Sequence, residues 1–343
     1  MSVRKIAELA GLSKSAVSLA LHNSPKIPPA TRQRVLRVAR RLGYHPNAKV
    51  NELMSQLRRN RPRQTEASLG VFSLYAEAQP WRRSLHLGRI YDSMAERAAF
   101  FGYRLDPLWL REPGMTPHRF RAILAARGIQ GLMCFGSTEL DDPLPPELNG
   151  FAIVSQGLSI RTPLHRVMSH VYNDLWRILD RLHALGYQRP GLVLGRYEDI
   201  RSAHAHVSVY LGWCQVVLGA PTAIPVLTQE RVEEPPFAAW FARYRPDAIV
   251  LVHHYNFLGE FEQMLRRRRI RVPQDLGVAA MSQILEGTRF AGLQENQRLL
   301  GEWCVELLVS RILSQDFALP EHPRIEMVER QWIEGASLGP PRR

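Results

Sequence analysis

Four histidines in two close pairs are the residues of this chain best suited to catalysis. The pairs are His204 with His206 and His253 with His254. Paired imidazoles can bind a metal ion or transfer protons. However, no carboxylate or cysteine accompanies them at ligand spacing, and the sequence contains neither a phosphate-binding glycine loop nor a nucleophile elbow. Adjacent side chains on a strand also point to opposite faces. We therefore expect no enzyme, no catalytic residue, no cofactor and no metal site.

A second chemical signal is the positive charge concentrated near the amino terminus. Residues 1–64 contain 14 Lys or Arg and 2 acidic residues, whereas the rest of the 343-residue chain contains 31 basic and 30 acidic residues. A basic segment joined to a neutral body is expected of a module that displaces counterions from a polyanion such as nucleic acid. The alternative is a tail that only aids solubility, but such tails lack the apolar periodicity of this segment.

The basic segment has the pattern of three short helices. Residues 4–10 carry apolar side chains on one helical face and are followed by Gly11, which can end a helix. Ser13 is a suitable N-cap for a second helix over residues 14–22. A proline pair then precedes a third helix that ends at Gly43. Two helices joined by a turn centred on a glycine, with a third helix closing the core, allow one helix to enter a major groove.

Specific motifs connect this chain to a known family. The head contains Ile6–Ser13, Ala16–Ser18, Thr31–Arg32 and Gly43–Asn47, and the body contains Tyr187–Pro190, Arg245–Ala248, Val272–Val278 and Gln297–Gly301. In residue type and ungapped spacing the head resembles the LacI/GalR family of bacterial transcriptional regulators, and the resemblance covers almost the whole chain. It implies a sequence-specific DNA-binding regulator, most often a repressor, that binds a pseudo-palindromic operator as a dimer and responds to a small-molecule effector.

The resemblance implies that the second helix reads base edges in the major groove. The matching positions are Lys14, Ser15, Ala16 and Ser18. A lysine can donate to guanine O6 or N7 or to a phosphate, serines can bond bases or phosphates, and an alanine can contact a thymine methyl group. Leu19 stands where the family frequently has arginine. We therefore expect no guanine contact from that position.

Phosphate contacts are expected around the same helix. The candidates are Ser13, Asn23, Lys26, Thr31, Tyr44 and Asn47. Contacts to phosphates fix the register of the protein on the duplex without specifying sequence. The alternative interpretation is that Ser13 and Thr31 only cap helices and that Tyr44 only packs in the core.

Residues 47–57 are weakly amphipathic and resemble the hinge helix of the family. The resemblance implies that Leu53 inserts into the minor groove at the operator centre, where the hinge helices of two subunits pack together. An apolar wedge of this kind unstacks a base step and bends the duplex. Alternatively, Leu53 packs against its own sensor domain. Val50 replaces a residue that is often small in this helix, which would alter the packing of the pair.

Beyond residue 67 short apolar runs alternate with helical segments. The predicted strands are 69–75, 103–108, 131–135, 151–155, 191–194, 248–252 and 277–281, and the predicted helices are 85–101, 117–127, 174–185, 209–218, 257–267 and 299–312. This alternation is typical of parallel sheets with crossover helices. Two lobes of this type form a cleft at their strand ends.

The expected fold class is an all-α helix-turn-helix DNA-binding head followed by an α/β, two-lobed, periplasmic-binding-protein-like sensor domain built on doubly wound parallel sheets. The expected domains are a helix-turn-helix domain over residues 1–46, a hinge helix and basic linker over 47–66, and an effector-binding and dimerisation domain over 67–343. Its lobes are expected near residues 67–160 and 190–290, with a crossover and C-terminal segment.

The expected effector pocket departs from the pattern of sugar-binding relatives. Where such relatives usually have an arginine and an aspartate, this chain has Val209 and His254. The pocket therefore lacks a bidentate donor and a charged acceptor for sugar hydroxyls, which argues against an ordinary sugar as the effector. The candidate pocket residues are Tyr75, Gln156, Val209, His254, Tyr255 and Gln294, each of which could equally be a loop or packing residue. The effector is therefore unidentified, and a regulator without an effector is an alternative.

The remaining features define the class of protein. Apolar residues make up 45% of the chain and charged residues 22%, which is typical of a globular protein. Three widely spaced cysteines suggest neither disulfides nor a zinc site. No apolar run is long enough for a signal peptide or a membrane span, so we expect a cytoplasmic protein and disfavour a solute-binding protein. Because two heads gain affinity by linkage, we expect a homodimer, and the short tail lacks the heptads of a coiled-coil tetramer.

Overall fold

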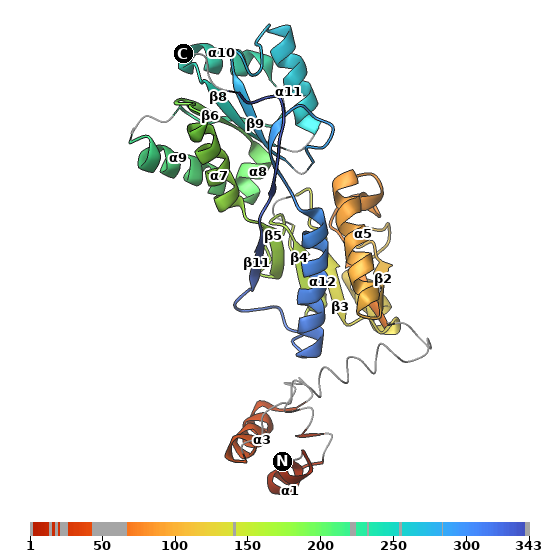
Figure 1. The fold of residues 1–343 in the computed structure, drawn as a ribbon. Helices are drawn as coiled ribbons and strands as arrows, with labels where there is room; N and C mark the ends of the chain where they lie inside the picture. The colour runs from red at the N-terminus through yellow and green to blue at the C-terminus, as the bar shows by residue number, and fades with distance from the viewer. Residues whose placement is uncertain are drawn as a thin grey trace.

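The computed structural model describes residues 3–13, 16, 17, 20, 27–42, 67–139, 142–219, 224–231, 233–253, 256–282 and 284–339. These residues form a helical head and a body of two α/β lobes, which are stacked along the long axis of the body (Figure 1). The predicted hinge helix over residues 47–57 lies outside the described residues. Of the predicted second helix, the structure describes residues 16, 17 and 20.

The head is built around a small apolar core. Helices α1 (Val3–Ala10) and α3 (Pro29–Arg41) confirm the first and third predicted helices. Between them, Val17 is fully buried against Ile6 and Val35. Burial of one apolar stripe from each segment is what holds such short helices together, because isolated helices of this length are marginal in water.

Lobe 1 is a parallel sheet covered by helices on both faces. Its strands are β1 (Ala67–Phe72), β2 (Tyr103–Pro107), β3 (Gly131–Cys134), β4 (Ala152–Gln156), β5 (His165–Ser169) and β11 (Ile325–Val328), in the order β11-β5-β4-β3-β1-β2. Its helices are α5 (Leu85–Phe100), α6 (Pro117–Ala126) and α12 (Gln297–Leu313), with short 3-10 turns η1 (Pro80–Arg82) and η2 (Pro146–Leu148). Helices α5 and α12 pack together on one face, and α6 covers the other.

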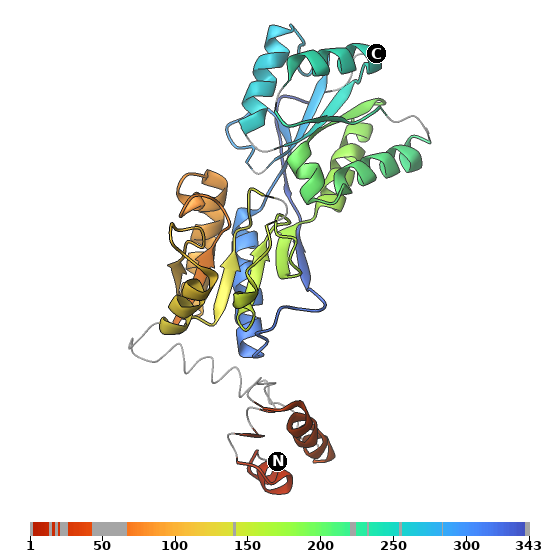
Figure 2. The same cartoon turned by 180° about the vertical axis from the view of Figure 1, so that it is seen from behind.

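Lobe 2 repeats this architecture. Its strands are β6 (Pro190–Gly195), β7 (Leu227–Gln229), β8 (Ala248–Val252), β9 (Gly277–Ser282), β10 (Ala291–Gln294) and β12 (Gln331–Ile333), in the order β12-β10-β9-β8-β6-β7, with β12 antiparallel to β10. Its helices are α7 (Val171–Ala184), α8 (Arg196–Arg201), α9 (Ala205–Val217), α10 (Glu234–Tyr244) and α11 (Asn256–Arg267). Seen from behind, α7 and α9 lie on one side of the sheet, and α10 and α11 lie on the other (Figure 2).

The chain passes between the lobes at three places within the described residues. These crossings lie at His170, at Glu295–Asn296 and at Glu329–Arg330. As a result, α12 and β11 return to lobe 1 after lobe 2 has been built, and β12 then returns to lobe 2. The lobes therefore extend past the approximate limits expected from the sequence. Three parallel connections allow the lobes to move relative to each other while keeping their own cores intact.

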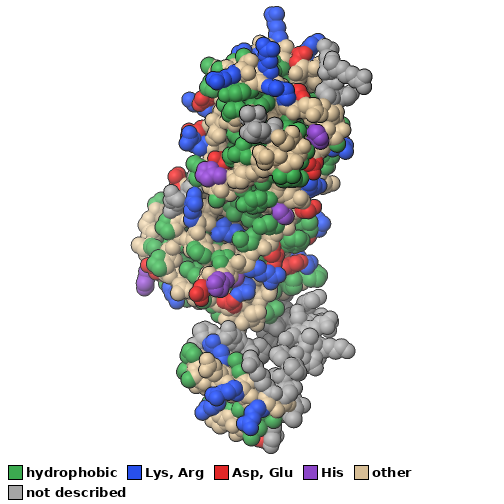
Figure 3. All heavy atoms as spheres, turned by 90° about the vertical axis from the view of Figure 1, so that its left-hand side faces the viewer, with side chains coloured by type: hydrophobic (Ala, Val, Ile, Leu, Met, Phe, Trp, Pro, Cys, Tyr) green, Lys and Arg blue, Asp and Glu red, His purple; other side chains and the backbone are tan. Residues whose placement is uncertain are grey.

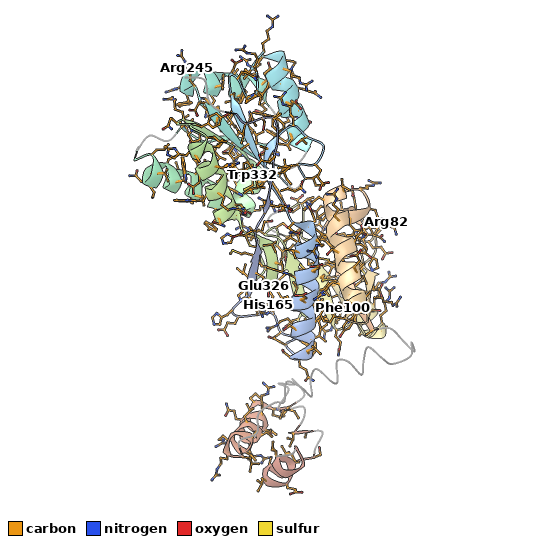
Figure 4. The ribbon with its side chains drawn as sticks, in the orientation of Figure 1. Arg82, Phe100, His165, Arg245, Glu326 and Trp332 are labelled. Atoms are coloured by element: carbon orange, nitrogen blue, oxygen red, sulfur yellow. The ribbon has the colours of Figure 1, made fainter. Side chains whose placement is uncertain are left out.

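All the predicted strands and helices of the body are present, with ends shifted by at most four residues. The pattern missed the shorter or more polar elements, which are β5, β7, β10, β11, β12, α8 and α10. Strand β5 contains His165 and Arg166, both buried, so it has no continuous apolar run. Figure 4 shows His165 beside Glu326, which lies on the neighbouring strand β11. Helix α10 begins with two prolines, which resemble a loop in sequence although proline is well tolerated in a first helical turn.

Candidate DNA-binding head and interlobe cavity

Three of the residues predicted to bind DNA are described by the structure. Ser13 is exposed, and its Oγ accepts a hydrogen bond from the backbone N–H of Ala16 at 3.1 Å, as expected of a helix N-cap. Ala16 is half-buried, and Thr31 is half-buried in the first turn of α3. The other predicted DNA contacts lie outside the described residues: Lys14, Ser15, Ser18, Asn23, Lys26, Tyr44, Asn47 and Leu53.

The charge of the head is carried by exposed side chains. Arg34, Arg37 and Arg41 of α3 are exposed, and sequence reasoning did not single them out. Glu8 is the one acidic residue between residues 3 and 42 of the sequence. In Figure 3 the charged side chains of the described head are mostly basic, whereas acidic and basic side chains are interspersed over the lobes. The head therefore presents a positive surface to a polyanion.

A cavity of about 460 Å³ lies where the two lobes meet. Lobe 1 contributes residues from the loop after β1, from α5 and from the ends of β3, β4 and β5, while lobe 2 contributes α8 and the start of α9. The polar and charged residues that line it are Tyr75, His86, Thr138, Gln156, Ser159, Ser169, Tyr197, Glu198, Arg201, Ser202, His206, Glu295 and Arg330. The volume is within the range of small-molecule sites.

Two of the crossing segments meet at a buried ion pair in this cavity. Arg330 Nη2 donates to Glu295 Oε1 at 2.6 Å, and Ser169 Oγ donates to the same oxygen at 2.8 Å. His86 Nε2 lies 3.4 Å from the other carboxylate oxygen. Burial alone would raise the pKa of Glu295, but the charge and hydrogen bond of Arg330, together with the charge of Arg201, outweigh it and bring the pKa to about 2. Glu295 is therefore ionised at neutral pH.

The two histidines that line the cavity are neutral at pH 7. Burial lowers the pKa of His206 to about 3, and the nearby Arg330 and Arg201 lower it further in the same direction. The Nδ1 atom of His206 is hydrogen-bonded to Ser202 Oγ at 3.0 Å. Burial also lowers the pKa of His86, although Glu295 opposes this effect. The imidazoles therefore supply hydrogen-bonding groups and no charge.

The paired histidines of the sequence do not form one site. His204 is exposed and hydrogen-bonds through Nδ1 to Asp199 Oδ2 at 2.9 Å, whereas His206 faces the cavity. His253 stacks on Phe257, with ring centroids 3.9 Å apart. His254 lies outside the described residues. In the part of the chain that the structure describes, no group of three or more His, Cys, Asp or Glu side chains could hold a metal ion.

The predicted effector residues are only partly brought together. Tyr75 and Gln156 line the cavity, and burial raises the pKa of Tyr75 to about 12, so its phenol is protonated. Val209 is buried in the core of lobe 2 and does not line the cavity. Gln294 also lies off the lining, because its Oε1 accepts from the backbone N–H of Leu285 at 2.7 Å. His254 and Tyr255 lie outside the described residues.

Sequence reasoning missed the charged residues of the cavity. Arg201 lies eight residues before Val209, at the end of α8, and Glu198 lies one turn earlier on the same helix. Glu295 and Arg330 belong to crossing segments that are far from α8 in the sequence. In sugar-binding relatives the arginine stands at the position of Val209, so comparison at that position does not reveal Arg201. The sequence signal for Arg201 is that it follows closely on the end of a predicted strand of the second lobe.

Two polar contacts join the lobes beside the cavity. Tyr197 of lobe 2 donates from its hydroxyl to the carbonyl oxygen of Ser137 in lobe 1 at 2.7 Å. Arg89 of α5 binds Glu286 of lobe 2 at 2.8 Å. Trp332 lies on β12, the strand by which the chain returns to lobe 2. Figure 4 shows it near the junction of the lobes. These two bonds help to hold the observed arrangement of the lobes.

A basic helical head followed by a two-lobed α/β body with an interlobe cavity defines a DNA-binding regulator with a sensor domain. A sequence profile described as bacterial regulatory proteins, lacI family, matches residues 2–47. The chain is 21% identical over 354 aligned positions to the HTH-type transcriptional repressor PurR of Haemophilus influenzae, with 95% of both chains covered.

Solved structures agree with this fold. A CelR–cellobiose complex superposes with a TM-score of 0.61 at 21% identity, over 98% of this chain and all of that one. A lac repressor dimer bound to operator and an anti-inducer superposes with a TM-score of 0.58 at 16% identity, over 98% of both chains. Residues 2–47 thus match the DNA-binding domain of the lacI family, and nearly the whole chain is similar to a transcriptional repressor, so its function is DNA-binding regulation. No helix in the described residues is both long and apolar enough to span a membrane.

Proposed function

We propose that this protein is a dimeric repressor that binds a pseudo-palindromic operator in the cytoplasm and is controlled by a small molecule bound between its lobes. The observation that carries the proposal is the combination of a basic head with a polar cavity placed where the chain crosses between lobes. The head supplies affinity for DNA. The cavity supplies a site at which a ligand can act on both lobes at once.

The proposed DNA-binding unit comprises residues 1–46, followed by a hinge helix and linker over 47–66 and the sensor domain from residue 67. Lys14, Ser15, Ala16 and Ser18 read base edges, and Leu53 enters the minor groove. The capping bond from Ala16 to Ser13 supports this assignment, because it begins a helix at the position where base readout starts. The exposed arginines of α3 add attraction to phosphates.

The proposed dimer follows from the size of the head. One short three-helix unit contacts few base pairs, whereas two linked heads on adjacent half-sites gain affinity without new contacts. The relative solved as a dimer on its operator supports this assembly. In a dimer, a ligand that changes the angle between the lobes also changes the spacing of the two heads, and this couples the cavity to DNA binding.

The test of this function uses the full-length protein and a fluorescent duplex from its own upstream region. We expect binding whose affinity falls steeply with salt, with a slope of about −0.9 for each phosphate neutralised. A chain that starts at residue 67 should lose this binding. Analytical ultracentrifugation of the complex should give two chains per operator. A full-length protein that shows no salt-sensitive association at low ionic strength would contradict the proposal.

A further inference from the structure

Two arginines in the interlobe cavity have nitrogen atoms without a protein partner. Arg201 Nε, Arg330 Nε and Arg330 Nη1 are buried and have no hydrogen-bond acceptor among the described residues. Arg330 as a whole is only 6% exposed. Buried donors are nearly always hydrogen-bonded in folded proteins, so these three donors are suited to binding an acceptor group of a ligand. Glu198 Oε2 and Glu295 Oε2 of the same lining also have no hydrogen-bond partner among the described residues and can accept from its polar hydrogens.

Neither carboxylate of the cavity lining forms a direct ion pair with Arg201. Arg330 is paired with Glu295 at 2.6 Å, and the lining histidines are neutral. Glu198 is the remaining carboxylate of the lining. Its Oε2 atom lies beside Gly195, together with the ring of His253. If Gly195 carried a side chain, the Cβ atom would lie 2.1 Å from Glu198 Oε2 and 3.0 Å from His253 Nε2.

The carboxylate of Glu198 is thus turned toward the strand ends of lobe 2. Within the described chain, no carboxylate forms an ion pair with Arg201. The Arg201 guanidinium instead lies over the ring of Tyr197, 5.7 Å from its centroid. The half-buried guanidinium of Arg201 therefore has no directly bonded carboxylate among the described residues, although its charge contributes to the lowered pKa of Glu295. Its free Nε–H can donate to an anionic group of a bound molecule.

The rest of the lining is suited to an apolar body. Lobe 1 contributes Leu87, Phe135, Leu158 and Met168, together with the ring of Tyr75. A cavity of about 460 Å³ with an apolar wall and a localised charge fits a small molecule that has one anionic group on a hydrophobic or aromatic frame. A sugar would place hydroxyl groups against this wall and leave the guanidinium groups without a charged acceptor.

We propose that the effector is a small organic acid whose carboxylate binds Arg201 and the open donors of Arg330, while its apolar body packs against the wall of lobe 1. This inference rests on the proposed function, because it assigns a ligand class to the same cavity. A planar guanidinium binds a carboxylate through two parallel hydrogen bonds, which gives both affinity and orientation.

The same geometry links the ligand to the arrangement of the lobes. Arg201 belongs to lobe 2, Arg330 to a crossing segment and the apolar wall to lobe 1. An acid held by all three favours whichever angle between the lobes brings them together. The acid then shifts the equilibrium between two lobe arrangements. The size of that shift is set by the difference between its affinities for the two arrangements.

The experiment uses the full-length protein, isothermal titration calorimetry and matched probe pairs. The probes are benzoate, phenylacetate and 4-hydroxybenzoate, each compared with its neutral amide, and sucrose as a sugar probe. We expect at least one carboxylate to bind, with its amide binding at least roughly tenfold more weakly because the charge-assisted bonds are lost. Arg201→Gln should weaken the binding of that carboxylate by a similar factor. Arg201→Lys should bind it more tightly than Arg201→Gln does, because the positive charge is kept.

Arg196→Gln is the matched control. Arg196 lies on the same helix, is exposed and pairs with Glu230 at 3.5 Å, so its loss should leave carboxylate binding unchanged. Thermal unfolding without ligand gives a second readout. Because no carboxylate pairs directly with Arg201, Arg201→Gln should be about as stable as the wild type, whereas an arginine with a structural role would leave the variant less stable.

Four outcomes would overturn the inference. They are failure of every carboxylate to bind, equal binding of acid and amide, binding of sucrose alone, or full carboxylate affinity in Arg201→Gln. DNA binding is measured on the same preparations. If the wild type binds its operator in a salt-sensitive manner while no carboxylate binds, only the ligand class is wrong. If operator binding is itself absent, the proposed function fails independently of the ligand result.

Discussion

Arg330 Nη2 lies 2.6 Å from Glu295 Oε1, and the two residues belong to different segments that connect the lobes. Both side chains are less than a tenth exposed. A buried pair of this kind contributes little net stability compared with apolar residues, but removing one partner leaves the other charge desolvated and unpaired. The pair thus ties the stability of the crossing region to the presence of both charges.

The first prediction concerns this pair. Glu295→Gln should lower the free energy of unfolding by about 3–5 kcal/mol, because it removes the carboxylate that pairs directly with the buried guanidinium of Arg330. Urea unfolding followed by circular dichroism measures the change. Glu302→Gln is the control, since Glu302 pairs with Arg298 on the surface at 2.6 Å and exposed pairs contribute about 0–1 kcal/mol. Equal losses in the two variants would contradict the prediction.

The second prediction concerns pH. The pKa of His206 is lowered from 6.5 to about 3 by burial and the nearby arginines, so the folded protein binds fewer protons there than the unfolded chain does. The free energy of unfolding should therefore fall progressively as pH decreases from about 6.5 to about 3. Below that range both states bind the proton, so His206 adds no further pH dependence. His206→Asn, which keeps a partner for Ser202, should reduce the slope. The exposed His118→Asn should leave it unchanged, and an identical slope in all three proteins would show that His206 is not responsible.

The third prediction concerns the head. Ser13→Ala removes the acceptor of the Ala16 N–H and should destabilise the second helix by about 1 kcal/mol. Operator affinity should fall, because part of the binding energy is then used to order that helix. Ser13→Asn keeps a capping acceptor and should recover most of the affinity. Fluorescence anisotropy with the upstream duplex measures both variants. If Ala and Asn weaken binding equally, Ser13 acts through its hydroxyl on DNA and not as a cap.

The fourth prediction concerns the angle between the lobes. Tyr197→Phe removes the hydrogen bond to the carbonyl oxygen of Ser137 and should shift the balance of lobe arrangements by about 1 kcal/mol, or roughly fivefold. Small-angle scattering of the full-length protein should then give a larger radius of gyration. Tyr172→Phe is the control, because Tyr172 is half exposed on α7. An unchanged scattering curve for Tyr197→Phe would indicate that this bond does not hold the lobes.

Much of the fold could be predicted from local pattern. Apolar runs such as Ala248–Val252 are buried on both faces of a parallel sheet, so they are continuous and easy to recognise. Strand β5 was missed because its buried Arg166 donates to backbone carbonyls of Ile160 and Thr162, an arrangement that only the folded chain reveals. Helix α10 was missed because prolines in a first turn resemble a loop.

The site could be predicted only where function depends on one short segment. The N-cap role of Ser13 is local, so spacing alone revealed it. The cavity instead combines Arg201, Glu295 and Arg330, which meet only because the chain crosses between lobes three times. The family pattern singled out Val209, but Val209 packs in the core of lobe 2. It did not single out Arg201, which lies eight residues earlier and lines the cavity.

The path of the chain has a consequence for synthesis. Helix α12 covers the apolar face formed by α5 and the lobe 1 sheet, with Leu300, Cys304 and Leu308 fully buried there. Until the ribosome has released residues beyond 313, that face has no cover, although strands β1 to β5 have long since emerged. A nascent chain that has not yet exposed α12 therefore carries an uncovered apolar face, and its need for chaperones should be greatest before α12 emerges from the ribosome.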